Sequence, residues 1–280
     1  YFLMINFDGK CFSSFKTVPE ELLSCLNSLP IHTHHLIAFE GKISLLEAHY
    51  FSAMAALRRF RVKIPIHYTL DFFQEQTDLL NDFIKNPRDA QQLGLKFYRK
   101  KPPIQNEALG SICFLMQENE FPLDNKTLDL TLYKDHYIFA NDYSNLFQTN
   151  NSLRELGQVF AYENGFGAAL LLNDRKRLVE STHGAVFLIQ HDGIQTPALS
   201  EGTANTVIRN AFIQFLEKEC EVQKVESEIA TFSIQQAQEI LLISSAYGFI
   251  HIGQFRKKKF EKEKSVSLFF QFLDYLKNQL

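Results

Sequence analysis

The sequence predicts an α/β (α+β) protein built from two domains. The chain has 280 residues, 45% of them apolar and 27 of them Phe, which is enough to fill one large core or two ordinary ones. Strand-like and helix-like hydrophobic patterns follow one another along the chain. A polar stretch with a central proline, residues 117–125, divides these patterns into two groups. We therefore expect an N-terminal α/β domain over 1–120 and a C-terminal α/β domain over 121–280.

The first domain is expected to be an antiparallel sheet with helices. Residues 36–43 indicate a hairpin with its turn at Glu40-Gly41. Ser44-Leu-Leu-Glu47 has the form of a capping box, which predicts a helix that continues until Pro65. A further helix and two strands are expected over 70–85, 95–99 and 111–116.

The second domain is expected to open with a strand of alternating hydrophobicity over 127–133. The helix after it ends at Asn164-Gly165, a pair typical of helix ends. Helices are predicted over 152–163, over 205–219 and from 265, and strands over 169–172, over 186–189, near 240 and near 250.

Composition excludes several classes of partner. The formal net charge is −3 and the pI is near 6.3, so the chain lacks the basic field that nucleic acid or an acidic membrane surface attracts. The four cysteines lie far apart without Cys-x-x-Cys spacing, which argues against a disulfide framework and against a zinc site. No stretch reads as a secretory leader or as a membrane span. We expect a cytoplasmic protein in a reducing compartment, with no nucleic-acid or membrane partner.

The segment His32-Thr-His-His35 raises the question of a metal site, because imidazoles are common ligands. No acidic residue or cysteine stands at a recognisable spacing from it. We therefore expect no metal, and interpret the segment as a pocket wall or a surface strand, with His49 packed in the first helix.

Two regions carry a resemblance to a known family. Gly41-Lys-Ile-Ser-Leu-Leu-Glu-Ala-His-Tyr-Phe-Ser52 is similar to the motif Gly-Lys-Ile-x-x-Leu-Glu-x-His-x-x-Arg, and residues 127–260 match further motifs in order and spacing. The chain resembles the branched-chain aminotransferase, D-amino-acid aminotransferase and aminodeoxychorismate lyase family, the fold-type IV pyridoxal-phosphate enzymes. The resemblance implies a two-domain fold-type IV architecture, a homodimer, a pyridoxal phosphate cofactor and a pocket between the domains.

The chain departs from this family at the residue that forms the Schiff base with the cofactor. In the family a lysine stands in a Leu-Lys-Thr-x-Asn context, and here Gln148 takes its place. No lysine occurs between Lys134 and Lys176, so a shifted alignment does not restore it. An amide nitrogen neither bonds covalently to the cofactor aldehyde nor moves a Cα proton, and the family's chemistry depends on both.

Two other positions concern the cofactor ring and its phosphate. Glu180 matches the glutamate that binds the pyridine nitrogen in the family, and the alternative is an exposed glutamate at the end of a strand. Ser52 stands where the family has a phosphate-binding arginine, whose bidentate contact a hydroxyl cannot replace. Read without the resemblance, Ser52 is an ordinary helix position.

The resemblance also places a phosphate-binding turn in this chain. Thr206 replaces the glycine of that turn, and the amides of Val207 and Ile208 remain as anion donors at a helix N-terminus. Ser244 and Ser245 match a Thr-Asn pair that contributes another phosphate contact, although serine pairs are also common in turns.

Two functions remain open at this point. The first is a catalytically degenerate family member, a homodimer that binds a small anionic or amino-acid-like ligand or a protein partner, with pyridoxal phosphate bound weakly or not at all. The alternative is an active pyridoxal-phosphate-dependent aminodeoxychorismate lyase or amino-acid aminotransferase in which another residue replaces the lysine.

Overall fold

The computed structural model describes residues 5–81, 90–100, 112–119, 126–223 and 225–280. The chain divides into two compact units, Tyr1–Phe121 with Leu276–Leu280, and Pro122–Tyr275. The last five residues therefore belong with the first unit. None of the helices in the described part of the chain is long and apolar enough to cross a membrane.

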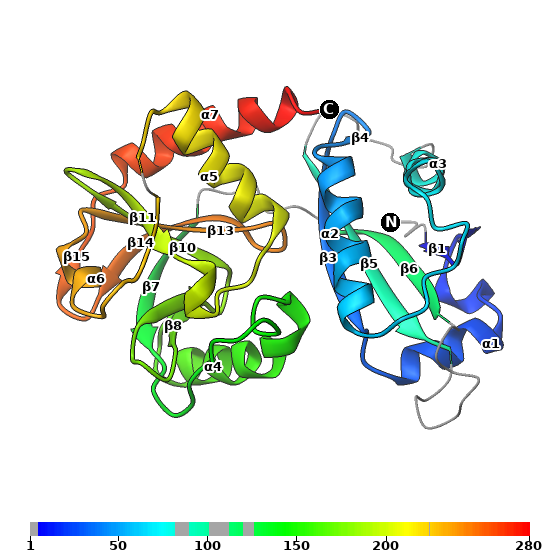
Figure 1. Ribbon diagram of the computed structural model, residues 1–280, viewed down its shortest axis with the longest axis horizontal. Helices are drawn as coiled ribbons and strands as arrows, with labels where there is room; N and C mark the ends of the chain where they lie inside the picture. The colour runs from blue at the N-terminus through cyan, green and yellow to red at the C-terminus, as the bar shows by residue number, and fades with distance from the viewer. Residues whose placement is uncertain (1–4, 82–89, 101–111, 120–125, 224) are drawn as a thin grey trace. The chain divides into compact units, whose positions relative to one another are not determined.

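Unit 1 contains a six-stranded antiparallel sheet with the strand order β2-β1-β6-β5-β3-β4 (Figure 1). Its strands are β1 (Ile5–Phe7), β2 (Lys10–Phe12), β3 (His32–Phe39), β4 (Lys42–Ile43), β5 (Gln91–Arg99) and β6 (Ile112–Asn119). Its helices are η1 (Phe15–Thr17), α1 (Glu20–Leu23), η2 (Ser24–Asn27), α2 (Leu46–Arg59) and α3 (Leu70–Asn81).

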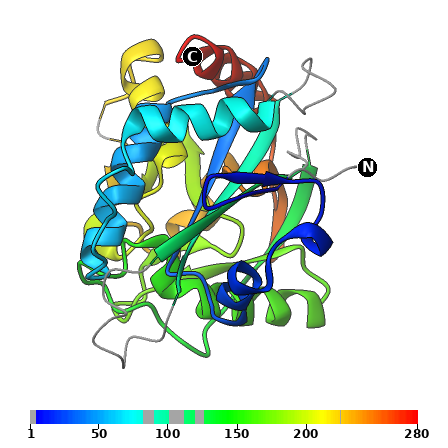
Figure 2. The ribbon, with the colours of Figure 1, turned by 90° about the vertical axis from the view of Figure 1, so that its right-hand side faces the viewer.

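Alternation along the strands of unit 1 produces two apolar faces. Phe97 and Phe114 point to the side covered by α2 and α3, where they join Met54; Figure 2 shows these helices crossing the sheet. Their chain neighbours Tyr98 and Cys113 point to the other side, toward the segment from η1 to η2. Since successive side chains of a strand face opposite ways, β5 and β6 contribute to both cores.

The expected hairpin, first helix and strands of unit 1 are confirmed, and the second helix is confirmed over 70–81, while residues 82–85 lie outside the described residues. The predicted capping box is wrong. Helix α2 begins at Leu46, after Leu45 in the left-handed conformation with φ of 58°. The Ser44 hydroxyl instead donates to the carbonyl of Leu276 at 2.7 Å. The Ser44 hydroxyl therefore forms a tertiary hydrogen bond instead of capping the helix.

Two boundaries predicted for unit 1 are also wrong. Helix α2 ends at Arg59, and the backbone turns at Arg61, with φ of 57°, before Pro65 is reached. Residues 117–119 continue strand β6 rather than starting the linker, because they pair with β5 and β1. Residues 120–125, the remainder of the predicted linker, lie outside the described residues.

Unit 2 is built on a nine-stranded mixed sheet with the order β12-β11-β10-β13-β14-β7-β8-β9, and β15 pairs with β14. The strands are β7 (Lys126–Leu132), β8 (Ala168–Leu172), β9 (Leu178–Ser181), β10 (Ala185–Gln190), β11 (Gly193–Pro197), β12 (Glu226–Ser227), β13 (Glu239–Ser244), β14 (Gly248–Phe255) and β15 (Lys258–Lys259). The helices are η4 (Phe147–Asn150), α4 (Asn151–Glu163), η5 (Leu199–Glu201), α5 (Val207–Glu219), α6 (Ser233–Gln236) and α7 (Glu263–Lys277).

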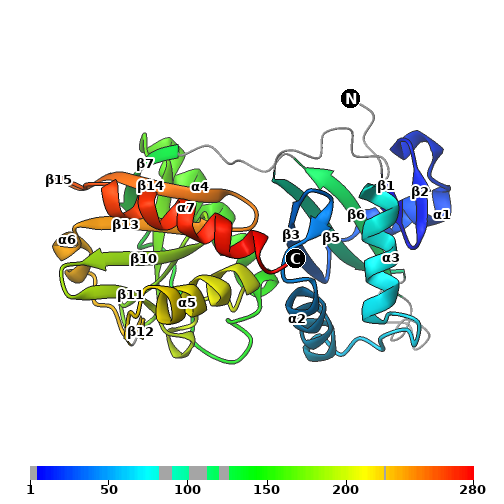
Figure 3. The same cartoon turned by 90° about the horizontal axis from the view of Figure 1, so that it is seen from above.

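The sheet of unit 2 curls so that its edge strand β9 returns to contact β10 and β11. The enclosed side is apolar and includes Leu130, Leu178 and Leu242. Helices α5 and α7 lie next to each other on the outer side (Figure 3), where Phe212 packs edge-on against Phe187 of β10 and Phe272 of α7. Helix α4 covers β8 and β9. The predicted α+β class is confirmed.

The predicted helices and strands of unit 2 are confirmed within a few residues, and several elements were missed. The sequence analysis did not identify β9, β11, β12, β15 and α6 as elements of the sheet and its connections. These are short, from two to five residues, and hydrophobic periodicity needs a longer window to be recognised.

A chain of buried histidines crosses the core of unit 1, which corrects the expectation of a surface strand. His32 Nε2 lies 3.2 Å from His34 Nδ1, and His34 Nε2 lies 2.7 Å from His49 Nδ1. Burial lowers the pKa of His32 to about 4 and of His49 to about 3, and repulsion among the imidazoles adds to the effect. Among the described residues no group of His, Cys, Asp and Glu can hold a metal ion. These histidines are therefore neutral core residues at pH 7.

We predict that unit 1 loses stability as the pH falls from about 6.5 toward 3. The unfolded chain takes up protons on these histidines near pH 6.5, whereas the folded chain does so only near pH 3 to 4. Each such histidine lowers the unfolding free energy by about 1.4 kcal/mol per pH unit in this window. Urea unfolding between pH 7.5 and 4 measures the slope.

His49→Gln should reduce that slope, and His67→Gln, a change at an exposed histidine of the same unit, should leave it as in the wild type. Equal slopes in the wild type and in His49→Gln would contradict the prediction.

Candidate functional site

Glu180 is a buried carboxylate at the centre of the candidate site. It lies in β9, is 2% exposed, and both of its oxygens are engaged. Oε1 accepts from Arg154 Nε at 2.8 Å, and Oε2 accepts from the backbone N–H of Ala204 at 3.1 Å. The alternative of an exposed glutamate at a strand end is therefore wrong.

Arg154 is the partner of Glu180, and its side chain is also buried. It reaches Glu180 from α4 while Nη1 donates to the carbonyl of Phe147. The guanidinium lies over the Phe147 ring, 4.4 Å from its centroid. Nη2 is buried without a hydrogen-bond partner among the described residues. Arg154 and Glu180 form a buried ion pair. Burial removes both charges from water, and only well-aligned hydrogen bonds between them offset the lost hydration free energy.

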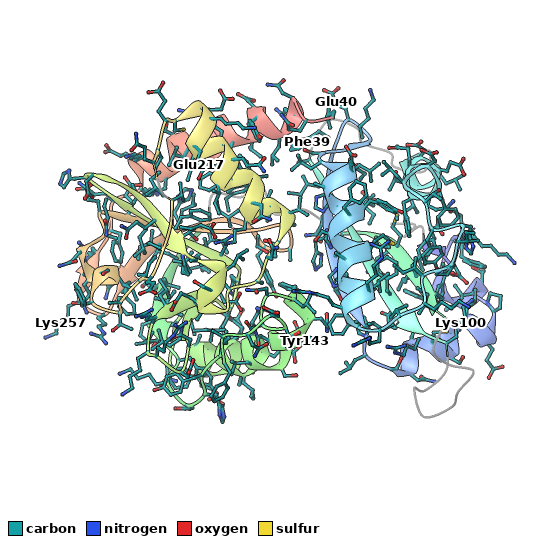
Figure 4. The ribbon with its side chains drawn as sticks, in the orientation of Figure 1. Phe39, Glu40, Lys100, Tyr143, Glu217 and Lys257 are labelled. Carbon is teal, nitrogen blue, oxygen red and sulfur yellow. The ribbon has the colours of Figure 1, made fainter. Side chains whose placement is uncertain are left out.

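Gln148 lies in η4, in a loop attached to the segment before α5. Asn145, three residues earlier, donates from Nδ2 to the carbonyls of Leu199 and Thr203 at 2.9 and 2.8 Å. Because Arg154 also holds the carbonyl of Phe147, the turn with Gln148 is fixed next to the Glu180 pair. Tyr143, labelled in Figure 4, is an exposed side chain of the same loop.

The N-terminus of α5 follows this segment. Thr206 is the N-cap residue, and its hydroxyl accepts from the N–H of Arg209 at 3.4 Å. Val207 and Ile208 are the first two helical residues, positions whose N–H groups have no partner within the helix. Their amides can therefore still donate to an anion, whereas the Thr206 side chain already serves the helix.

Ser244 ends β13 and lies against the turn between β9 and β10. Its hydroxyl accepts from the N–H groups of Ala246 and Tyr247 at 3.0 and 3.3 Å, and therefore organises the turn that contains Ser245. A Cβ placed on Gly184 would lie 2.9 Å from the Ser244 Cβ and 2.4 Å from the Ile243 carbonyl oxygen. Only glycine allows these two turns to approach so closely.

An aromatic pair joins the same two turns. The rings of His183 and Tyr247 have centroids 4.5 Å apart. Burial lowers the pKa of His183 to about 4, so this imidazole is neutral at pH 7. The side chain is available for stacking and hydrogen bonding rather than as a positive charge.

The structure places the candidate residues of the second half on connected segments of unit 2, and Ser52 belongs to unit 1. Gln148, Glu180, the Thr206–Ile208 turn and Ser244 belong to connected segments of unit 2, whereas Ser52 lies on α2 of unit 1. The resemblance expects Gln148 at the lysine position and Glu180 at the ring nitrogen of the cofactor. In the structure the carboxylate of Glu180 already binds Arg154.

Arg154 is the residue that sequence reasoning missed. In α4 the buried positions are Arg154, Gly157 and Ala161, while the apolar Leu156 and Val159 are about half exposed, at 52% and 54%. A pattern that weighs only hydrophobicity favours burying the leucine and the valine. The sequence contained one signal for a buried arginine, because Arg154 lies on the same helix face as the small residues Gly157 and Ala161.

Comparisons with known proteins agree on one family. Residues 36–255 match the family described as amino-transferase class IV. A probable branched-chain-amino-acid aminotransferase of Aquifex aeolicus is 31% identical over 91 residues, which are 32% of this chain and 29% of that relative. The similar stretch thus spans less than a third of that relative's length.

Solved structures show the same fold at low sequence identity. The branched-chain amino acid aminotransferase of Thermobaculum terrenum in its PLP form has a TM-score of 0.82 at 14% identity, covering 99% of this chain and 94% of that one. A putative 4-amino-4-deoxychorismate lyase of Legionella pneumophila has a TM-score of 0.76 at 16% identity, covering 88% and 90%. The predicted fold-type IV aminotransferase-like architecture is confirmed.

We predict that Gly184→Ala destabilises unit 2 strongly. Gly184 has φ of 141°, a conformation that side chains avoid, and the new methyl group would overlap the Ile243 carbonyl. We expect an unfolding free energy lower by roughly 2–5 kcal/mol, from backbone strain and overpacking together. Chemical unfolding followed by fluorescence or circular dichroism measures the change.

The matched control is Gly165→Ala, because Gly165 also has positive φ, 77°, but nothing lies within 4 Å of its added Cβ. That variant should lose only about 1–2 kcal/mol. The same loss in both variants would show that close packing of the two turns does not matter.

Proposed function

The chain belongs to the class IV aminotransferase family, and we propose that it is a degenerate member that carries out no covalent pyridoxal phosphate chemistry. In this proposal the inherited fold serves to bind a small ligand or a partner protein. Pyridoxal phosphate, which a structural neighbour contains in its PLP form, binds here weakly or not at all.

The observation that carries the proposal is the absence of a lysine from residues 135–175, a stretch that lies wholly within the family match. Gln148 stands at the position that the family motif assigns to that lysine. The amide nitrogen of glutamine shares its lone pair with the carbonyl, so it is neither a nucleophile nor a base. Covalent capture of an aldehyde and proton transfer at a substrate carbon both need an amine there.

The neighbouring contacts support the same reading. Glu180 is neutralised by Arg154 at 2.8 Å, so a ring nitrogen would have to displace a buried guanidinium to reach it. Ser52 offers no charge to a phosphate. The amides of Val207 and Ile208 remain as anion donors, and they support a ligand that is anionic or amino-acid-like rather than a tightly held cofactor.

An active enzyme of the family, an aminodeoxychorismate lyase or an amino-acid aminotransferase, is the second candidate. It is favoured by the carboxylate that survives at Glu180 and by the helix N-terminus at Val207. It requires an amine from outside residues 135–175 to reach the cofactor aldehyde. Its substrate would be an amino acid or an aminodeoxychorismate-like compound.

Assembly and location belong to the same proposal. We propose a homodimer, as in the family that the sequence resembles, that binds a small anionic or amino-acid-like ligand. The four cysteines lie far apart in the sequence and do not suggest a disulfide framework, which supports a cytoplasmic location. Sedimentation at micromolar protein concentration tests the assembly, and a monomer alone would contradict it.

We predict that borohydride reduction of the native protein with one equivalent of pyridoxal phosphate labels no lysine stoichiometrically. Peptide mapping by mass spectrometry and absorbance at visible wavelengths measure the outcome. The same reaction on urea-unfolded protein gives the background labelling of all lysines. A stoichiometric adduct on one lysine of the native protein would overturn the degenerate assignment and support the enzyme.

A further inference from the structure

The surroundings of the Arg154 guanidinium form a slot for a planar cation. One face of the guanidinium lies over the Phe147 ring, 4.4 Å from the centroid. One edge meets the carboxylate of Glu180 through Nε, and another meets the carbonyl of Phe147 through Nη1. An aromatic face with acceptors around its rim is the arrangement that recognises flat nitrogen cations.

The slot is buried and its acceptors are fully used. The side chains of Arg154 and Glu180 are 6% and 3% exposed. The second oxygen of Glu180 takes the N–H of Ala204. Without Arg154 the carboxylate would keep only that one neutral hydrogen-bond donor, because Arg209, the other nearby cation, donates to Pro197 and Glu226. A buried carboxylate without a directly bonded cation is strongly unfavourable. The site therefore requires a cation, and the chain supplies its own.

We propose that Arg154 is the built-in occupant of a planar-cation slot, and that it is the residue that closes this slot to small molecules carrying a protonated, planar nitrogen group. The inference deepens the proposed function and rests on it in one respect, since an intrinsic occupant explains why a ring nitrogen finds no place at Glu180. Arg154 thereby determines the specificity of the site. The ligand that this chain does bind must offer acceptors, because Nη2 of Arg154 is a buried donor without a partner among the described residues.

A second buried carboxylate in unit 2 provides a control. Glu201 accepts from Arg175, Arg177 and Asn173 at 3.0, 3.2 and 2.7 Å. Removing Arg177 leaves a cation and an amide on that carboxylate. Arg177 is also 32% exposed, so water can enter the space that it leaves.

The experiment removes the Arg154 guanidinium by substitution and supplies a small guanidinium ion from solution. Arg154→Ala should lower the Tm by roughly 10 °C, because it leaves a buried carboxylate without its cation. Methylguanidinium at 10 mM should recover about half of that loss through binding to the folded protein. Tetramethylammonium at the same concentration has the charge but no N–H donor and no flat face, and should recover nothing.

Two further variants separate the slot from a general effect of guanidinium. Arg177→Ala should lose only a few degrees and gain nothing from methylguanidinium. Arg154→Ala combined with Glu180→Gln removes the carboxylate as well, so methylguanidinium should no longer raise its Tm. If Arg154→Ala does not fold in buffer, refolding with each cation becomes the measurement, and folding is expected with methylguanidinium alone.

Equal effects of the two cations on Arg154→Ala, or rescue that persists after Glu180→Gln, would overturn the proposal. So would a failure to fold with either cation. These results are independent of borohydride labelling, because they concern the cation slot and not a lysine. A stoichiometric native adduct with pyridoxal phosphate would overturn the proposed function and leave the rescue experiment interpretable.

Discussion

The carboxylate of Glu180 joins three segments of unit 2 that are far apart in the sequence. It holds α4 through Arg154, it lies in the edge strand β9, and it holds the segment before α5 through the N–H of Ala204. Arg154 extends the connection to the turn of Gln148 through the carbonyl of Phe147. Because buried charges are stable only when they are paired and hydrogen-bonded, these segments depend on one another for their positions.

The curled sheet makes this connection possible. Strand β9 is the last strand of the sheet, and the curl brings it back toward β10 and β11. Its side chains therefore reach a protected region instead of solvent, which is why a glutamate at a sheet edge is 2% exposed. The close approach at Gly184 then sets the turn after β9 against the end of β13. Backbone packing alone therefore positions the side chains of the candidate site.

The two units show different uses of buried polar groups. In unit 1 the histidines His32, His34 and His49 satisfy one another as neutral groups. In unit 2 the polar groups at the site are an ion pair and a set of backbone donors. Neutral imidazoles cost little at pH 7, whereas an ion pair depends on both partners being present. Acid is therefore expected to destabilise unit 1 through these histidines, and the loss of a single charged side chain is expected to destabilise the site of unit 2.

The family motifs, and with them the fold, were visible in the sequence because hydrophobic periodicity and turn residues survive extensive substitution. The hairpin at 36–43 and the end of α4 at Glu163 were predictable from local patterns. Short strands such as β12 and β15 were not, because two residues carry no periodicity.

The occupant of the candidate site was also beyond prediction from sequence. The position of Arg154 on the small-residue face of α4 does not by itself show that its charge is buried, since burial depends on where α4 rests on the sheet. Likewise, Ser44 has the form of a cap in the sequence and bonds to Leu276 in the fold. The sequence by itself determined the family motifs and the residue types that the chain offers. The tertiary structure alone decided which side chains meet, because pairs such as Arg154 and Glu180 are brought together by long-range packing.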